Sequence, residues 1–437
     1  MIKPKVGIYA VYEPSEEGWQ DWEAQLDEVA DMLISAGAEV LKAPEAVYDD
    51  ASCSSVGGWF KRQYIDVLYV LVVCWSFDHY TIRIQQAVNA PVIIRSIPGI
   101  RTGSIVGGQQ LNCILTDIDI EHMYYYSELG NEQVTRDAVV YATGCAMRNR
   151  LRGTRIGVVG SRTQGMTPTA VDEVEILRLF GVQLIHFGFD ELLVNANNIS
   201  QNAAEEAWRE VSTAAKEVSS GHEAGLAAMK NYLAAKQLVQ TLDLYALSIG
   251  AYPHCQGTMC LPIALLNDEG IIVGCEGDVN STLSMVLLSL LSDAPVHFGE
   301  MLEIDEAANT VVTSHCGAGA PSLANSSGFV LCPVRLANDG VCIRYSAKTG
   351  PVTYVNLVGR KGNYRLGAFE GEAVTTGMVF EGNPLKIHMK TSFHTIIKLV
   401  AENGFGHHWM TGYGHYSEIL QAFCRLVGMI GVFPDLS

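Results

Sequence analysis

Val67-Leu68-Tyr69-Val70-Leu71-Val72-Val73 is an unbroken run of apolar residues near the start of the chain. A strand has this composition when helices cover both faces of its sheet, because neither face then meets water. Apolar runs at 6–11 and 91–94 predict two further strands, and residues 22–34 have the spacing of a helix. Residues 1–150 are therefore predicted to form an open, doubly wound, Rossmann-like α/β domain.

A joint is expected at Asn149-Arg150-Leu151-Arg152-Gly153, after which the alternation of strands and helices restarts. The expected strands are 155–160, 182–185 and 244–249, and the expected helices are 169–180, 203–218, 222–242 and 279–291. This pattern predicts a second doubly wound domain over residues 151–294. After Pro295, short alternating strands separated by Gly, Asn and Pro predict a β-rich, barrel-like domain over 295–437, with a final helix at 416–427.

The composition favours large folded domains and a small-molecule partner. Hydrophobic residues make up 48% of the 437 residues, charged ones 17%, and the formal net charge is −18. That charge repels phosphates, which argues against nucleic acid or an anionic membrane as partner. The first residues lack the apolar core of a signal peptide, and the stretch 283–291 is too short to span a bilayer. Eleven cysteines without a paired pattern are expected to be free, mostly buried thiols, so we expect a cytoplasmic protein.

Glu276 follows the apolar run 270–275, which predicts a buried strand, and precedes residues 277–281, which predict the start of a helix. The carboxyl end of a strand beside a helix N-terminus is the usual ligand crevice of an open α/β sheet. The helix dipole favours a negative group there. Capping of the helix is the competing role: for Glu276 the two roles are evenly balanced, and for Asp278 the cap is favoured.

Glu300 is an acid on the predicted inner face of a strand. Alternate residues of a strand face opposite sides, and those that share the parity of Glu300 are apolar: Val296, Phe298, Leu302 and Ile304. Glu303 and Asp305 then lie on the polar face. An acid on the inner face costs on the order of several kcal/mol unless a cation or hydrogen bonds compensate it. Glu300 therefore predicts a partner of that kind.

The His407-His408 pair follows Asn403-Gly404-Phe405-Gly406, a Gly-rich loop that lets the backbone come close to a ligand. His315 is a further candidate. A histidine taken alone is more often a core or surface residue than a ligand. Two carboxylates with one or two imidazoles suit a hard divalent ion such as Mn²⁺, and Mg²⁺ less well. Zinc would be expected to recruit cysteine or more histidine.

Three segments of the chain resemble the L-fucose isomerase and L-arabinose isomerase superfamily. In fucose isomerases an E-x-D tripeptide ends a strand, an acid lies 24 residues after its Glu, and a late His opens an H-x5-GH motif. Here Glu276 and Asp278 match the tripeptide, and Glu300 lies 24 residues after Glu276. The segment from His408 to His415 repeats the late motif. The resemblance covers the whole three-domain order.

This resemblance implies a metal-dependent aldose–ketose isomerase that acts through a cis-enediolate on a pentose or hexose, whether plain, deoxy or otherwise modified. Its metal ligands would be Glu276, Glu300, His408 and His315, the last by similarity to an additional ligand of arabinose isomerases. The ion would be Mn²⁺, with Mg²⁺ or Co²⁺ as alternatives. Glu276 and Glu300 would also move the proton between C1 and C2 of the sugar.

The resemblance also implies substrate-binding residues and an assembly. Gln256 matches a Q-G element that contacts sugar, Trp75 matches a C-W element of the first domain, and Asp278 and His407 join them as substrate-binding residues. The superfamily forms trimers or hexamers in which the first domain of one subunit covers the site of another, so Trp75 would act on a neighbouring subunit. A core role for Trp75 is equally expected. Fucose-isomerase-like enzymes carry an Arg soon after the first strand, whereas this chain has none before Arg62, so the sugar or its orientation is expected to differ.

Four other functions compete with this interpretation. A metal-dependent sugar epimerase or an aldolase would use the same enediolate chemistry. A non-catalytic cytoplasmic sugar-binding protein also has two α/β lobes, but it would lack the inner-face Glu300 and a third, β-rich domain. A nicotinamide oxidoreductase is suggested only by Gly157-Val158-Val159-Gly160-Ser161, which is not a GxGxxG motif.

Overall fold

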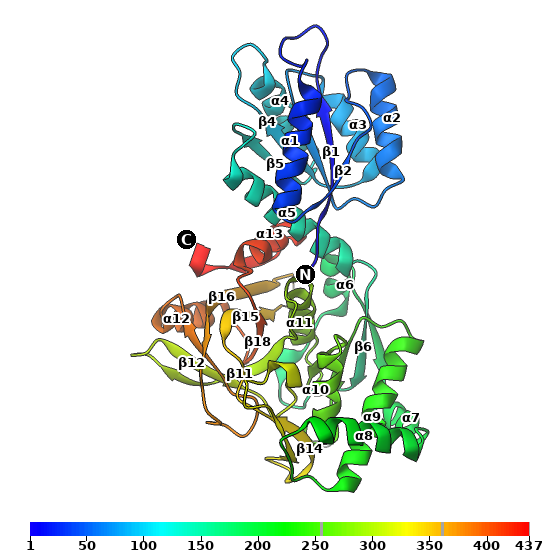
Figure 1. Ribbon diagram of the computed structural model, residues 1–437, viewed down its shortest axis with the longest axis vertical. Coiled ribbons are helices and arrows are strands. Elements are labelled where there is room, and N and C mark those ends of the chain that lie inside the picture. The colour runs from blue at the N-terminus through cyan, green and yellow to red at the C-terminus, as the bar shows by residue number, and fades with distance from the viewer. Residues whose placement is uncertain (254–256, 360–361, 437) are drawn as a thin grey trace. The chain divides into compact units, whose positions relative to one another are not determined.

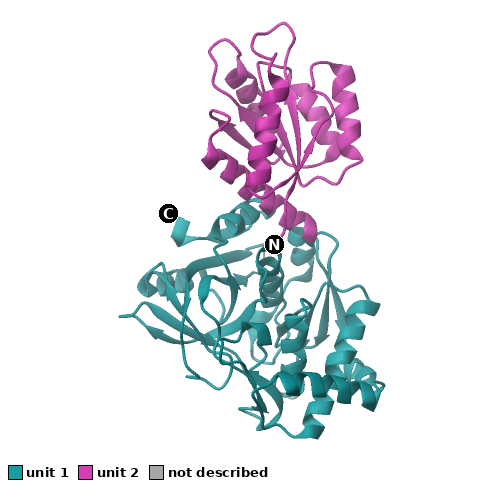
Figure 2. Ribbon diagram, viewed as in Figure 1, with its two compact units in different colours: residues 1, 151–437 teal, residues 2–150 magenta. Residues whose placement is uncertain are grey.

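The computed structural model describes residues 1–253, 257–359 and 362–436. The chain forms two compact units, residues 2–150 and residues 151–437 with residue 1 (Figures 1 and 2). Each contains a parallel sheet flanked by helices, and the second adds an antiparallel sheet, which confirms the predicted α/β class with a β-rich C-terminal part. Within these ranges, no helix has both the length and the apolar character that crossing a membrane requires.

Residues 2–150 form a five-stranded parallel sheet of order β2-β1-β3-β4-β5. Its strands are β1 (Lys5–Val11), β2 (Glu39–Lys42), β3 (Val67–Val72), β4 (Val92–Ser96) and β5 (His122–Tyr126). Its helices are α1 (Trp22–Ser35), α2 (Asp50–Lys61), α3 (Asp78–Val88), α4 (Ser104–Asp117) and α5 (Glu132–Leu151). Every residue of the central strand β3 is buried, as its apolar sequence predicts.

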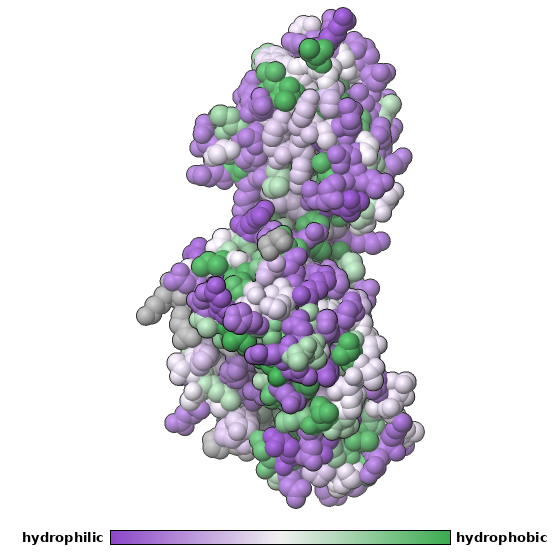
Figure 3. Space-filling model, turned by 90° about the vertical axis from the view of Figure 1, so that its left-hand side faces the viewer, coloured by the Kyte–Doolittle hydropathy of each residue, from purple (hydrophilic) through white to green (hydrophobic). Residues whose placement is uncertain are grey.

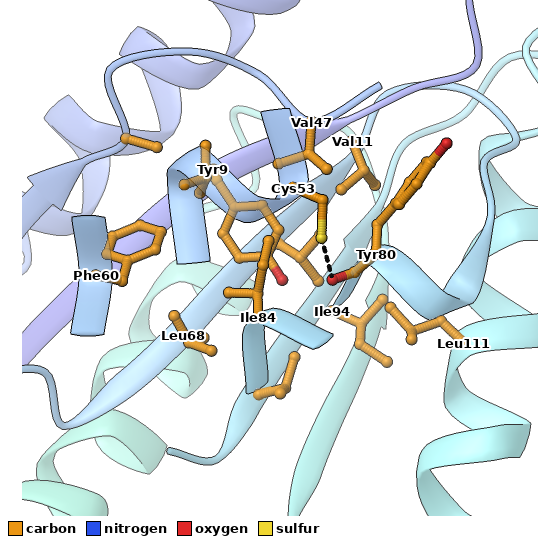
Figure 4. Packing of buried hydrophobic residues seen from close by; sticks show 14 of the residues in the cluster. Tyr9, Val11, Val47, Cys53, Phe60, Leu68, Tyr80, Ile84, Ile94 and Leu111 are labelled. Carbon is orange, nitrogen blue, oxygen red and sulfur yellow. Dashed lines mark hydrogen bonds between the residues drawn. The ribbon is translucent and has the colours of Figure 1, made fainter. Parts of the chain in front are cut away.

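An apolar core joins this sheet to α2 and α3 (Figure 4). Tyr9 of β1, Phe60 of α2 and Ile84 of α3 are all fully or almost fully buried in it. Burying one such side chain stabilises the fold by about 1.5–3 kcal/mol. This core therefore holds the strands of the sheet in place. The loops that follow the strands begin at their carboxyl ends.

Residues 151–437 begin with a four-stranded parallel sheet of order β10-β9-β6-β7. Its strands are β6 (Arg155–Gly160), β7 (Gln183–Phe187), β9 (Ala246–Gly250) and β10 (Ile272–Cys275). The helices are α6 (Glu173–Phe180), α7 (Phe189–Asn197), α8 (Gln201–Ala214), α9 (His222–Thr241), α10 (Cys260–Asp268) and α11 (Val279–Leu291). The helix predicted over 203–218 is too long, because residues 217–218 leave it and form strand β8.

The antiparallel sheet closes on itself. Its order is β15-β18-β11-β12-β17-β16-β19, and β15 also pairs with β16. The strands are β11 (His297–Asp305), β12 (Thr310–Ser314), β15 (Gly350–Val358), β16 (Arg365–Val374), β17 (Leu385–Met389), β18 (His408–Tyr413) and β19 (Ile430–Val432). The ring from β15 through β18, β11, β12, β17 and β16 back to β15 is the closed barrel that the short strands predicted.

A small sheet of three strands and two C-terminal helices also belong to this unit. Strands β13 (Val330–Val334) and β14 (Asp339–Arg344) pair with each other, and β13 also pairs with β8 (Glu217–Val218). Helices α12 (Phe393–Asn403) and α13 (Ser417–Val427) belong to the C-terminal part. Figure 3 shows hydrophilic side chains spread over much of the face that it draws, in keeping with the high net charge.

Helix α11 lies between the two sheets (Figure 1). It contacts β9 and β10 of the parallel sheet and β15 and β18 of the barrel. Every residue from Val279 to Leu288 is buried, as expected of a helix that is covered all round. The predicted boundary at 294/295 follows this helix and lies inside one compact unit; the three-domain division stays a prediction.

The buried carboxylate of Glu370 ties α13 to the barrel. The Glu370 carboxylate of β16 accepts from Lys390 Nζ at 2.5 Å and from the Ser417 backbone N–H at 3.2 Å. Burial raises the pKa of Glu370, but these two donors outweigh it and hold that pKa below its ordinary value of 4.5. A carboxyl whose folded pKa is depressed contributes stability above its unfolded pKa and loses it as the pH falls.

Glu370→Gln should therefore lower the free energy of unfolding at pH 7 by about 1–3 kcal/mol. The deficit relative to wild type should shrink as the pH falls below about 4.5, where the unfolded carboxyl is already protonated. Denaturant unfolding at several pH values measures this difference. Glu372→Gln, on the exposed side of the same strand, is the control. A deficit that stays constant down to pH 3 would contradict the role of the charge.

Candidate active site

Glu276 sits in the turn between β10 and α11. Its φ is +63°, and that of Gly277 is +68°. At Gly277 a Cβ would lie 2.8 Å from Arg162 Cα, so only glycine fits there. A non-glycine residue in the left-handed region costs about 1–3 kcal/mol and persists where its surroundings impose it, often at a functional site. Glu276 is not the helix cap, because the Asp278 side chain takes that role by accepting from the Ser281 N–H.

Glu276, His315 and His408 come together although they are far apart in the sequence. Glu276 Oε2 lies 3.2 Å from His408 Nε2, and Glu276 Oε1 lies 3.6 Å from His315 Nε2. The potential ligand atoms of all three lie within 4.8 Å of one another. Because His315 follows β12 and His408 opens β18, the barrel supplies both imidazoles and the parallel sheet supplies the carboxylate.

Asp278 binds the nitrogen of His408 that does not face Glu276. Its Oδ2 accepts from His408 Nδ1 at 2.8 Å and from Ser281 Oγ at 2.6 Å. A carboxylate on one imidazole nitrogen fixes the ring orientation and directs the other nitrogen at its partner. The predicted helix cap is confirmed, and the orienting contact with His408 is a role that the sequence did not reveal. Substrate binding by Asp278 stays a prediction.

Glu300 reaches the same cavity from β11. Its backbone is paired in register with His408 of β18. Its carboxylate lies close enough to the rings of His407 and His408 for the three side chains to form a group of potential metal ligands. Glu276 and Glu300 line one cavity of about 150 Å³ together with His315 and Cys316. His408 thus belongs to both groups of potential ligands, whereas Glu276 and Glu300 do not fall within one tight group.

The parity argument for Glu300 is only partly right. A bulge between Met301 and Glu303 shifts the register of β11 against β12. As a result, Leu302 is 39% exposed instead of facing the core. Glu300 itself is half-buried, and the part of the chain that the structure describes contains no ion-pair partner for it.

Strong electrostatic coupling links the buried groups. Burial raises the pKa of Glu276, but His315 and His408 outweigh it and hold that pKa below its ordinary range. Burial lowers the pKa of His408, but Asp278 and Glu276 raise it above its usual value. The pKa of His315 is raised well above its usual value against burial, by Cys316 and Glu276. Glu276 is therefore ionised at neutral pH.

The donor set fits a hard divalent ion. Glu276 Oε2 and His408 Nε2 are buried, face each other at 3.2 Å, and have no hydrogen-bond partner of good geometry. Neighbouring ligands of an octahedral ion with bonds of about 2.1 Å lie roughly 3 Å apart. A cation bound by both atoms would satisfy their lone pairs, and carboxylate with imidazole is a donor set that suits Mn²⁺.

Asn356 of β15 anchors the loop that carries the two histidines. Its Nδ2 donates to the carbonyl oxygens of Gly406 and His408, and its Oδ1 accepts from the Gly406 N–H at 3.1 Å. The ring of His407 lies 4.0 Å from that of His408. Burial and the nearby His408 lower the pKa of His407. His407 is thus beside the proposed ligand, and a role in binding substrate stays a prediction.

Three thiols lie behind His315. Cys316 Sγ is 3.3 Å from His315 Nδ1 and 3.7 Å from Cys260 Sγ, and Cys275 Sγ is in the same group of potential ligands. All cysteines among the described residues are free, and most are buried, as predicted. This cluster could not be predicted from the sequence, because its members come from separate elements. It confines His315 between a thiol and Glu276.

Gln256 and Trp75 are the two remaining residues that are predicted to bind substrate. Gln256 lies outside the described residues. Trp75 belongs to the other compact unit, where its Nε1 donates to Gln110 Oε1 at 3.2 Å and its ring meets Phe77 edge-on. A site role for each of them stays a prediction.

Asp278→Asn tests the orienting contact. Asparagine is as good a helix cap as aspartate, so α11 should stay intact, but its neutral amide accepts a weaker hydrogen bond from His408 Nδ1 than the carboxylate does. We expect Mn²⁺ affinity, measured by isothermal titration calorimetry, to fall about 10–100-fold. Asp172→Asn, at the cap of α6, is the matched control. Equal Mn²⁺ affinity in both variants would refute the orienting role.

No known protein-family model matches the chain. It is similar to curated proteins named sulfoquinovose isomerase. The protein of Priestia aryabhattai is 24% identical over 431 residues, which cover 92% of this chain and 95% of the relative. That of Alkalicoccus urumqiensis is 27% identical over 371 residues, covering 79% and 82%, and that of Clostridium sp. (strain MSTE9) is 26% identical over 381 residues, covering 83% and 84%.

Proposed function

We propose that this protein is a metal-dependent aldose–ketose isomerase whose substrate is a hexose of the sulfoquinovose type. The observation that carries the proposal is the cavity that Glu276 and Glu300, from different sheets, line together with His315. The chain is a sugar isomerase, as are the relatives that it matches over most of their length. The matching motifs around Glu276, Glu300 and His408 support placing it in the L-fucose and L-arabinose isomerase superfamily.

The reaction requires removal of a proton from the carbon beside a carbonyl. Glu276, His315 and His408 would hold the divalent ion, with Mn²⁺ favoured by the oxygen and nitrogen donors. When bound, the ion supplies a Lewis acid that stabilises negative charge on the sugar oxygens, a contribution of several kcal/mol in order of magnitude. Asp278 orients His408, and the buried surroundings keep bulk water from the carboxylate of Glu276.

The different surroundings of Glu276 and Glu300 suit them to different roles. Glu276 is engaged by two imidazoles and stays ionised, which suits a ligand. Glu300 is half-buried and has no ion-pair partner among the residues placed by the structure, and we assign it the role of proton carrier. In a cis-enediolate, C1 and C2 present the same face, so one carboxylate can remove the proton at C2 and return it at C1.

Product analysis tests the proposal directly. The protein, loaded with Mn²⁺, is incubated in D₂O with sulfoquinovose and a panel of aldoses, and the products are followed by NMR. We expect the corresponding ketose, with deuterium at C1 when solvent exchanges with the carboxyl that carries the proton. Epimers without ketose would indicate a sugar epimerase, and shorter fragments would indicate an aldolase.

We also propose that the site is completed by assembly into a homotrimer or homohexamer. The superfamily resemblance supports a neighbouring subunit that brings its residues 2–150, with Trp75, over the cavity. Sedimentation velocity tests the oligomer. A mixed assembly of Trp75→Ala and Glu300→Gln subunits tests the sharing of sites: it should regain part of the activity that neither variant has alone.

A further inference from the structure

Arg335 gives the cavity a positive charge that the isomerase chemistry does not use. It follows β13 in the turn that leads to β14, and it lines the cavity together with Glu276 and Glu300. Leu336 and Phe380 form the wall beside it. The turn thus brings a guanidinium into the lining of the cavity that also contains Glu276 and Glu300.

The guanidinium of Arg335 is held by a ring and not by an acid. Its Cζ lies 5.0 Å from the centre of the Phe380 ring, a cation–π contact. Among the residues with described positions, no carboxylate pairs with it. The nearby acid Glu381 is already paired with Arg344, 3.6 Å away. The hydrogen-bonding edge of Arg335 is therefore available to a ligand.

The charges of the cavity favour an anionic ligand. A divalent ion offsets the two negative charges of Glu276 and Glu300, and Arg344 offsets Glu381. The charge of Arg335 is then left over. A neutral sugar carries no negative charge to pair with Arg335. A sulfonate, phosphate or carboxylate does, and it accepts two parallel hydrogen bonds from a guanidinium.

We propose that Arg335 forms a subsite for an anionic group at the end of the sugar remote from the carbonyl, and that this group is a sulfonate. The inference rests on the proposed isomerase function. It adds which group of the substrate the protein recognises and which residue binds that group. Sulfoquinovose, named in the relatives, is a hexose with a sulfonate on C6. Quinovose is the same 6-deoxy sugar without the sulfonate, so the pair isolates the contribution of the anion.

The test compares Arg335→Gln with the wild-type protein, both loaded with Mn²⁺. For wild type we expect kcat/KM for sulfoquinovose to exceed that for quinovose. In Arg335→Gln, kcat/KM for sulfoquinovose should fall about 10–100-fold, mainly through KM, because a charge-assisted hydrogen bond is lost. The value for quinovose should not change. Arg178→Gln removes the same charge from an arginine that is paired with Glu175 and does not line the cavity, and it should leave the ratio between the two sugars unchanged.

A binding measurement separates this subsite from the isomerase function. 6-Deoxy-6-sulfoglucitol has no carbonyl and cannot be isomerised, so calorimetric titration with it reports binding alone. Its affinity should fall about 10–100-fold in Arg335→Gln, and in wild type it should weaken as salt rises. Equal affinity of this polyol for both proteins overturns the subsite, whether or not any sugar is isomerised. Loss of isomerisation with a large difference in polyol affinity overturns the proposed function and leaves the subsite standing.

Two further ligands identify the anion. Glucose 6-phosphate and glucuronate carry a phosphate and a carboxylate at the same end of the sugar. Selectivity for sulfoquinovose over both, lost in Arg335→Gln, supports the sulfonate. A preference for glucose 6-phosphate or glucuronate that depends on Arg335 would overturn the assignment to sulfonate. An effect of Arg335→Gln that is equal for quinovose and for all three anions would mean that the residue only shapes the loop.

Discussion

Glu300→Gln should lower kcat by about 10²–10⁴-fold, the usual contribution of a positioned acid–base group. Glutamine keeps the size of the side chain and its polarity but cannot accept and return a proton. The fold should persist, because Glu300 is half-buried and its pairing with β12 and β18 is made by the backbone, which the substitution leaves unchanged. Turnover of sulfoquinovose and thermal unfolding measured on the same preparation give both quantities.

Glu303→Gln is the matched control for this experiment. Glu303 lies on the same strand beyond the bulge, is exposed, and does not line the cavity. It should keep turnover within about twofold of wild type, as surface substitutions away from special features have small effects. Turnover near wild type in Glu300→Gln would show that Glu300 is not the proton carrier. A comparable loss in both variants would point to damage of the strand.

Exhaustive chelation should abolish turnover, and Mn²⁺ should restore it. Without a cation, Glu276 Oε2 and His408 Nε2 remain buried and have no partner. The positive charge that would stabilise the sugar oxygens during the reaction is then missing. Because an ion that binds only the folded protein stabilises it, the melting temperature should also fall on chelation and rise with added Mn²⁺.

Metal content must be measured with activity, by elemental analysis of the chelated protein. Addition of Mg²⁺ and Co²⁺ in separate samples ranks the alternatives to Mn²⁺. His408→Gln should show neither the restored turnover nor the Mn²⁺-dependent rise in melting temperature. Unaltered turnover in protein that has demonstrably lost its metal would contradict the whole mechanism.

Much of the fold could be predicted because its signals are local. The apolar run at 67–73 indicated a strand covered on both faces, and β3 is fully buried. The helix predicted over 203–218 extended too far because residues 217–218 pair with β13, more than a hundred positions later. The helical spacing of apolar residues carries no information about a pairing partner so far away in the sequence. The bulge in β11 was missed for a similar reason, since it depends on the register with β12.

The candidate site was predicted where a motif preserved its spacing. Glu276, His315 and His408 do meet, and Glu300 does line the same cavity. The hold of Asp278 on His408 could not be foreseen, because it joins residues 130 positions apart. Arg335 was missed because it lies in a turn without periodicity, and only the folded structure places it beside the acids.

Helix α11 limits how this protein can be recombined with its relatives. One of its faces is shaped by the parallel sheet and the other by the barrel, so a foreign barrel would meet a surface that it was not selected to fit. Chimeras that cross over between α11 and β11 should therefore express poorly, whereas exchange of residues 151–437 as a block keeps both interfaces native. Glu276 and Glu300, one on each side of that junction, are then inherited together.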